Sequence, residues 1–135
     1  MDLQNQSLLH QLKLIFELVA AQFPNKQATF QFESDLQGGI DIAAWEPALR
    51  ELAELAIQNS PNGSTIMTSV IQTQRDIEIE IADAAQQAIP TNAPAIVKAR
   101  TIAAPIGGRI DVLPCAQGGT AYILSIPRWK IEAAA

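Results

Sequence analysis

The side chains that most often carry catalysis are scarce in this chain. Among 135 residues there is one histidine, His10, and one cysteine, Cys115. His10 lies in a predicted helix, on the side away from its apolar positions, where an exposed imidazole could accept a phosphoryl group. A single cysteine excludes an internal disulfide, and with one histidine it cannot close a zinc site. No Ser/His/Asp triad is available, because the only histidine lacks a supporting motif.

Two carboxylates have settings that could belong to a site. Glu51 lies in a predicted helix that ends at Ser60-Pro61. Asp83 follows an alternating run, Ile77-Glu78-Ile79-Glu80-Ile81. Carboxylates accept hydrogen bonds and, together with other oxygens, bind hard cations. Each also has a purely structural interpretation, Glu51 as a solvated helix residue and Asp83 as a strand-end residue.

The elements that must position these residues follow from hydrophobic periodicity. Apolar residues at helical spacing predict three helices, over Leu8 to Phe23, Glu46 to Asn59 and Ala95 to Ala104. Alternating residues predict strands over Ala28–Glu33, Ile40–Ile42, Thr65–Gln72, Ile77–Ile81, Arg109–Leu113 and Thr120–Ile126. The last four should form two hairpins, with the isoleucines of residues 77–81 facing the helices. This order predicts an α+β fold, a two-layer sandwich with helices on one face of a mixed, mainly antiparallel sheet.

Composition favours an ordinary globular protein of about one domain. Hydrophobic residues make up 48% and charged residues 17% of the chain, and the net charge is −5. An acidic chain lacks the basic face that nucleic acids require, so we expect no nucleic-acid partner. No apolar run approaches the length of a membrane span, and the N-terminus lacks the order of a signal peptide. We therefore expect a cytoplasmic protein without a membrane partner.

Several phrases resemble the ATP-binding domain of sensor histidine kinases, a member of the gyrase, heat-shock chaperone, kinase and MutL (GHKL, Bergerat-fold) superfamily. The run from Glu51 to Pro61, ELAELAIQNSP, is similar to the N-box helix, which ends in a "NAIKYSP"-like sequence. Ile77 to Asp83 resembles the strand that enters the "DxGxG" box. Gly107 to Val112 and Gly118 to Pro127 are similar to the family ending "GGRIxVxSxxGxGTxFxLxLP". The resemblance covers roughly residues 28–128 and keeps the order and spacing of the boxes.

This resemblance implies a nucleotide site, but the positions that would hold the nucleotide differ. The two N-box asparagines, of which the second coordinates Mg²⁺, correspond to Glu51 and Leu55, and leucine offers a hard cation no oxygen. Glu51 also matches the glutamate that activates water in gyrase-type members. Asp83 matches the aspartate that binds the adenine amino group, but Ala84-Ala85-Gln86-Gln87 follows it in place of the glycine pattern. Asp83 and Glu51 are therefore interpreted as vestigial nucleotide-binding residues.

The glycine-rich lid of the family is also missing. None of residues 84–106 is a glycine, and Asn92-Ala93-Pro94-Ala95-Ile96 occupies the place of the lid. A lid needs backbone amides that can cradle phosphate, and proline removes one such donor. We therefore expect no catalytic residue, no metal site, and no binding of ATP or Mg²⁺.

The sequence thus predicts a pseudo-ATPase, a non-catalytic histidine-kinase-like domain that acts in signal transduction through protein–protein contacts. Its expected partner is another signalling protein, with a kinase and a response regulator as the candidates. Two alternatives stay open. One is a histidine phosphotransfer protein of a two-component system with His10 as the phosphoacceptor. The other is a domain that binds a nucleotide weakly without Mg²⁺, with Asp83 as the adenine anchor.

We expect three segments along the chain. Residues 1–27 would form an N-terminal helix that serves as a linker or in homodimerisation, residues 28–128 the degenerate kinase-like domain, and residues 129–135 a loose tail. The dimerisation hypothesis rests on nearly heptad spacing of apolar residues in the first helix. These residues are Leu8, Leu12, Ile15 and Val19.

Overall fold

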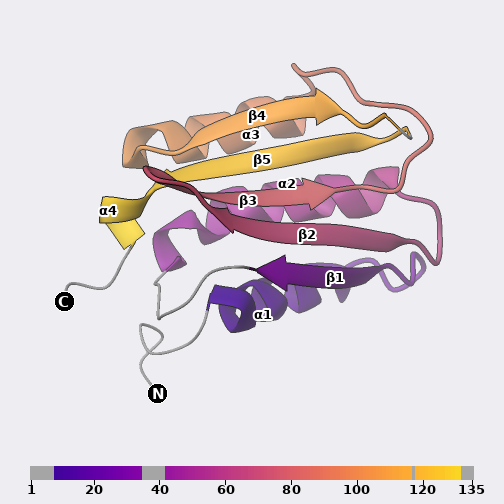
Figure 1. Ribbon diagram of the computed structural model, residues 1–135. Helices are drawn as coiled ribbons and strands as arrows, with labels where there is room; N and C mark the ends of the chain where they lie inside the picture. Colours follow the sequence, from indigo (N-terminus) through magenta and orange to yellow (C-terminus); the bar gives the residue numbers. More distant parts are fainter. Residues whose placement is uncertain (1–7, 35–41, 117, 132–135) are drawn as a thin grey trace.

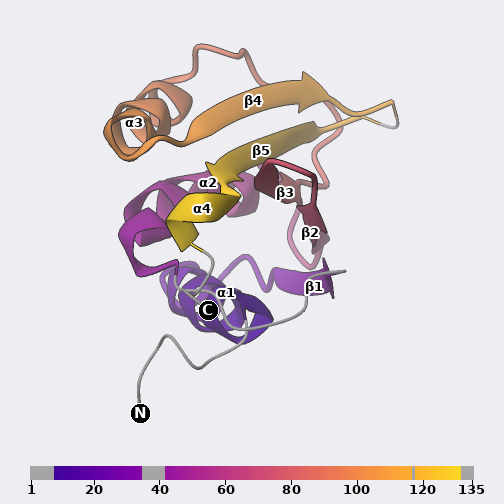
Figure 2. The same ribbon diagram turned by 60° about the vertical axis from the view of Figure 1, so that its left-hand side comes forward.

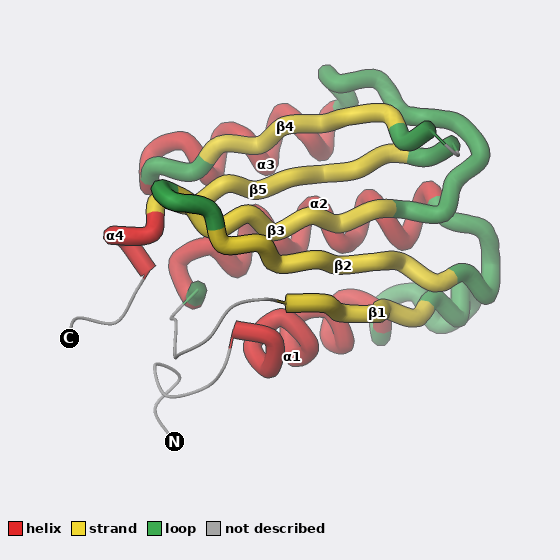
Figure 3. Tube along the Cα trace, viewed as in Figure 1, coloured by secondary structure: helices red, strands yellow, loops and turns green. Residues whose placement is uncertain are grey.

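The computed structural model describes residues 8–34, 42–116 and 118–131, and the account of the fold concerns these residues. Its helices are α1 (Leu8–Ala20), α2 (Glu46–Asn59), α3 (Pro94–Ala103) and α4 (Arg128–Ile131), with 3₁₀ turns η2 (Ala43–Trp45) and η3 (Ala104–Ile106). Its strands are β1 (Thr29–Ser34), β2 (Thr65–Gln72), β3 (Asp76–Ala82), β4 (Arg109–Pro114) and β5 (Thr120–Pro127). Figure 3 shows how the helices and strands separate into two layers.

The five strands form one sheet in the order β1-β2-β3-β5-β4 (Figure 1). β1 runs parallel to β2, and every other neighbouring pair is antiparallel. Helices α1, α2 and α3 lie on the same face of the sheet, which Figure 2 shows edge-on. The predicted α+β sandwich, its two hairpins and its mixed sheet are therefore confirmed.

The core lies between this helical layer and the inner face of the sheet. Ile77, Ile79 and Ile81 of β3 are fully buried in it, and Glu78 and Glu80 alternate with them on the outer face, as predicted. Burying one such aliphatic side chain contributes about 1.5–3 kcal/mol. β3 is the central strand of the sheet, so this alternation shows which face of the sheet packs against the helices and which faces solvent.

The apolar stripe of α1 belongs to the same core. Its members are fully or almost fully buried, so the stripe that predicted dimerisation is already covered within the chain, and that prediction is wrong for this face. The residues concerned are Leu8, Leu12, Ile15 and Val19. The exposed apolar residues of α1 are instead Leu14 and Leu18. Gln11 ties the helix to η2, because its Oε1 accepts a hydrogen bond from the Ile42 amide at 3.1 Å.

Two further predictions differ from the structure or fall outside it. Of the short strand predicted at Ile40–Ile42, residues 40 and 41 lie outside the described residues, and Ile42 leads into η2. Trp45, at the end of η2, is buried against Gly108, where a Cβ atom would lie 2.3 Å from the indole ring. Of the tail predicted at residues 129–135, residues 129–131 belong to the short helix α4, and residues 132–135 lie outside the described residues.

Candidate functional site

Asp83 lies directly after β3, and its carboxylate is bonded by donors of the chain itself. Only 7% of the residue is exposed. Its Oδ1 accepts hydrogen bonds from the Thr120 amide at 3.0 Å and the Ala85 amide at 3.2 Å. Its Oδ2 accepts from the Tyr122 hydroxyl at 2.7 Å. Both oxygens of the predicted adenine anchor therefore already have partners, contributed by β5 and by the loop that follows β3.

Tyr122 is the residue of this site that sequence reasoning missed. It is fully buried on β5, because it belongs to the inward-facing set of that strand. Burial raises the pKa of its hydroxyl, and the hydrogen bond to Asp83 raises it further, since ionisation would put a second negative charge beside the carboxylate. A signal was present in the family ending "GTxF", where this chain has tyrosine in place of phenylalanine.

This raised pKa predicts an alkaline transition that the protein itself reports. Tyr122 is the only tyrosine, so tyrosinate absorbance monitors this hydroxyl alone. An unfolded chain releases the phenolic proton near pH 10 and the folded chain only above it. The free energy of unfolding should therefore fall as the pH rises above about 10. We expect tyrosinate to appear together with loss of the circular dichroism signal. Tyrosinate forming near pH 10 in a protein that stays folded would contradict this assignment.

The loop that follows Asp83 is hydrogen-bonded to the end of α2 and to β5. The Ala84 amide donates to Ser60 Oγ at the end of α2, at 3.0 Å. The Ile89 amide donates to Thr120 Oγ1 at 2.9 Å, and the half-buried Ile89 side chain packs against the core. The loop is thus attached to the end of α2 through Ala84 and to β5 through Ile89.

Glu51 has a partner of its own on α3. Its Oε1 lies 2.8 Å from Lys98 Nζ, and this hydrogen bond is the main reason why the pKa of Lys98 is raised. Leu55, one turn further along α2, is buried at 9% exposure. The pair borders a surface hollow of 460 Å³. The hollow is lined by Glu46, Pro47, Arg50, Glu51, Glu54, Lys98 and Ile102.

Helix α3 is also held from its other side. Arg100 Nε donates to the Ile110 carbonyl of β4 at 3.1 Å, and Arg100 Nη1 donates to the Thr91 carbonyl at 3.1 Å. One side chain therefore joins α3, the loop before it and the edge strand of the sheet. Together with the Glu51–Lys98 pair, these contacts fix α3 against α2 and β4.

The remaining predicted residues do not join Asp83 in one site. His10 is exposed on α1, as expected, and α1 packs against α2 and β1. Cys115 lies in the turn between β4 and β5, where burial raises its pKa, and the charges of Asp83 and Glu80 raise it further. A raised pKa disfavours the thiolate, which is the nucleophilic form of cysteine. Asp83 and Glu51 each have a separate set of partners.

Comparison with known proteins identifies the fold. No family model matches the sequence, and no curated protein matches it. The catalytic domain of histidine kinase ThkA, in a nucleotide-free form, superposes with a TM-score of 0.74 at 17% identity, over 90% of this chain and 94% of that domain. The mycobacterial sensor histidine kinase MprB gives 0.65 at 15% identity, over 86% and 93%. The cytoplasmic segment of QseC gives 0.67 at 14% identity, over 90% and 75%. The chain thus has the fold of a histidine-kinase ATPase domain, as its motifs predicted.

Proposed function

We propose that this chain is a non-catalytic histidine-kinase-like domain that works in two-component signalling through protein contacts. The observation that carries the proposal is the state of Asp83. A carboxylate that binds adenine must present an accessible acceptor to the base, and here the residue is only 7% exposed and three of its roughly four acceptor positions are used by Thr120, Ala85 and Tyr122. A base that reached the carboxylate by displacing any of these donors would leave a buried donor unpaired, at about 1–3 kcal/mol for each one displaced.

The other positions of the site also do not fit Mg²⁺-ATP. Leu55 has no oxygen for the cation, and Glu51 is already paired with Lys98. Residues 84–106 contain no glycine, and the amides of Ala84 and Ile89 already donate within the chain. We therefore assign no chemical step to this site.

The proposed partner is another signalling protein, with a response regulator as the first candidate. One of the similar structures is described as ThkA in complex with the response regulator TrrA, and it matches 90% of this chain and 40% of that one at 17% identity and a TM-score of 0.71. None of the described helices combines the length and the apolar character that crossing a bilayer requires. A docking domain needs the shape of the kinase fold but not its nucleotide.

Phosphoryl transfer separates this proposal from the alternative that uses His10. The exposed imidazole on α1 favours the alternative, but a working acceptor also needs a surface that docks its partner. We expect no acid-labile label after incubation with γ-labelled ATP and Mg²⁺, and none after incubation with a phosphorylated response regulator. His10→Ala should change the free energy of unfolding by less than about 0.5 kcal/mol. Label that is present on the wild type and absent from His10→Ala would establish the phosphotransfer alternative instead.

A further inference from the structure

The face of the sheet that points away from the helices has an apolar row across four strands. The strand registers place Met67 of β2 beside Ala82 of β3, Ala82 beside Ala121 of β5, and Ala121 beside Leu113 of β4. Each of the four alternates along its strand with residues that face the core. Leu113 is 51% exposed, Met67 and Ala82 are half-buried, and Ala121 is buried between its neighbours at 6% exposure. In Figure 2 no described helix covers this face.

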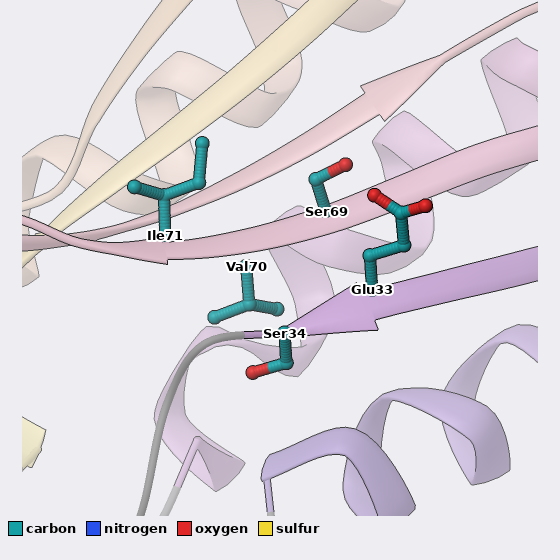
Figure 4. A pocket seen from close by; sticks show the side chains of 5 residues that line it. All are labelled: Glu33, Ser34, Ser69, Val70 and Ile71. Carbon is teal, nitrogen blue, oxygen red and sulfur yellow. The ribbon is translucent and has the colours of Figure 1, made fainter.

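A row of carboxylate side chains lies next to this apolar row, on the same face of the sheet. In the next register, Glu33 of β1 lies beside Ser69, Ser69 beside Glu80, and Glu80 beside Ile123. Glu78 is the next outward residue of β3, paired with Ile71, which is 42% exposed. Figure 4 shows Glu33, Ser69 and Ile71 projecting from β1 and β2 to the same side, next to a hollow of 350 Å³.

The charges of this face are largely uncompensated within the chain. Among the residues that the structure describes, no base lies within ion-pair distance of Glu33, Glu78 or Glu80, whereas Asp111 is paired with Arg109 at 3.2 Å. Adjacent strands are about 4.8 Å apart, so Glu33 and Glu80 lie about 10 Å from each other, close to the screening length at physiological salt. Salt screens most of their mutual repulsion at this spacing, but a cation placed between them would lie within about 5 Å of both carboxylates and be attracted by each.

Apolar side chains next to charges that are mostly negative, with Arg109 as a base paired to Asp111, are typical of a surface that binds a partner. The solvent face of an antiparallel sheet is normally polar, and an exposed apolar patch with a polar rim marks an interaction site. Charge complementarity determines which partners such a surface accepts. A surface rich in glutamate requires a basic partner and disfavours a second copy of this acidic chain.

We propose that this outer sheet face, formed by Met67, Ile71, Ala82, Leu113 and Ile123 with Glu33, Glu78 and Glu80, binds a protein partner through a basic amphipathic segment. The apolar side chains of that segment lie against Met67, Ala82 and Leu113, and its lysines or arginines lie against the carboxylates. The inference rests on the proposed function, because it names the contact surface through which a non-catalytic domain works. A domain that also turned over ATP would overturn the proposed function and leave this surface unaffected.

The test uses two synthetic peptides on the full chain, one of leucine and lysine in amphipathic order and one with glutamate in place of each lysine. Calorimetry measures affinity, and amide chemical shifts locate the binding surface. We expect the lysine peptide to bind with shifts at the outer sheet face, and the glutamate peptide not to bind. Glu80→Lys should weaken binding about tenfold, as should Leu113→Asp at an exposed position, which tests the apolar contribution separately. The matched control Glu17→Lys, an exposed carboxylate on α1, should change affinity less than about twofold.

Three results would overturn this proposal. One is peptide shifts that map to Leu14 and Leu18 of α1, which border an apolar hollow of 140 Å³. Another is an equal loss of affinity in Glu80→Lys and Glu17→Lys, which would indicate attraction by net charge alone. The third is affinity unchanged in both Glu80→Lys and Leu113→Asp when circular dichroism shows that the variants are folded.

Discussion

Asp83→Ala should lower the free energy of unfolding by about 3 kcal/mol. The substitution removes the acceptor of three hydrogen bonds, two of which are buried, and leaves the Thr120 amide and the Tyr122 hydroxyl proton without the carboxylate that accepts them. Breaking a buried polar network in this way is among the few mechanisms that give large destabilisation. A carboxylate reserved for adenine would face an open pocket, and its removal would have little effect on stability. Chemical denaturation of the variant and the wild type measures the difference.

Two further variants, at Asp83 and at Asp111, serve as comparisons for this loss of stability. Asp83→Asn keeps an oxygen for the Thr120 amide and an amino group that can donate to the Tyr122 hydroxyl, so we expect a loss of only about 1 kcal/mol. Asp111→Ala removes a carboxylate that is exposed and paired at the surface with Arg109, and we expect a change within about 0.5 kcal/mol. If Asp83→Ala is as stable as Asp111→Ala, the carboxylate does not hold the site together.

The second large effect is expected at Gly119, which enters β5 directly beside Asp83. A Cβ atom there would lie 2.7 Å from Asp83 Oδ1, 2.9 Å from the Asp83 carbonyl and 3.0 Å from the Ala85 carbonyl. Two of these neighbours are backbone atoms that cannot turn away. The φ angle of +83° adds strain for any residue with a side chain. We expect Gly119→Ala to lower the free energy of unfolding by about 3 kcal/mol, measured by denaturation.

Gly63 provides a matched control for this substitution. Its φ angle is +79°, but no atom lies within 4 Å of the place where its Cβ would stand. Gly63→Ala should therefore show the backbone strain alone, at about 1 kcal/mol. Equal losses in the two variants would mean that the close approach to Asp83 contributes nothing.

Local patterns were enough to predict most of the fold. The alternation of Ile77, Ile79 and Ile81 with glutamates predicted both the strand and its buried face. In a two-layer sandwich one face of each strand packs against the helices and the other faces solvent. Ser60-Pro61 marked the end of the second helix, which in the structure ends at Asn59. The buried face of α1 was misjudged because a heptad-like stripe fits an intrachain core as well as a dimer.

The candidate site was only partly predictable. Sequence reasoning identified Asp83 and the replacement at Leu55, because each occupies a fixed place within a motif. The bonds that engage Asp83 come from Thr120 and Tyr122, which are 37 and 39 residues away in sequence and meet it only through the pairing of β3 with β5. The same holds for the pair between Glu51 and Lys98, which depends on how α3 packs against α2. No local pattern encodes such contacts.

The measurement that tests the central claim most directly is calorimetric titration of the wild-type chain with ATP, once with Mg²⁺ and once with a chelator. Asp83→Asn is titrated in parallel, since it should fold and still lacks the carboxylate. We predict no binding heat in either titration at physiological ATP concentration, because the Asp83 carboxylate is buried and bonded within the chain and Leu55 cannot hold the cation. Binding only in the presence of chelator, and lost in Asp83→Asn, would replace the account with the Mg²⁺-independent nucleotide domain. A micromolar dissociation constant for Mg²⁺-ATP would contradict it.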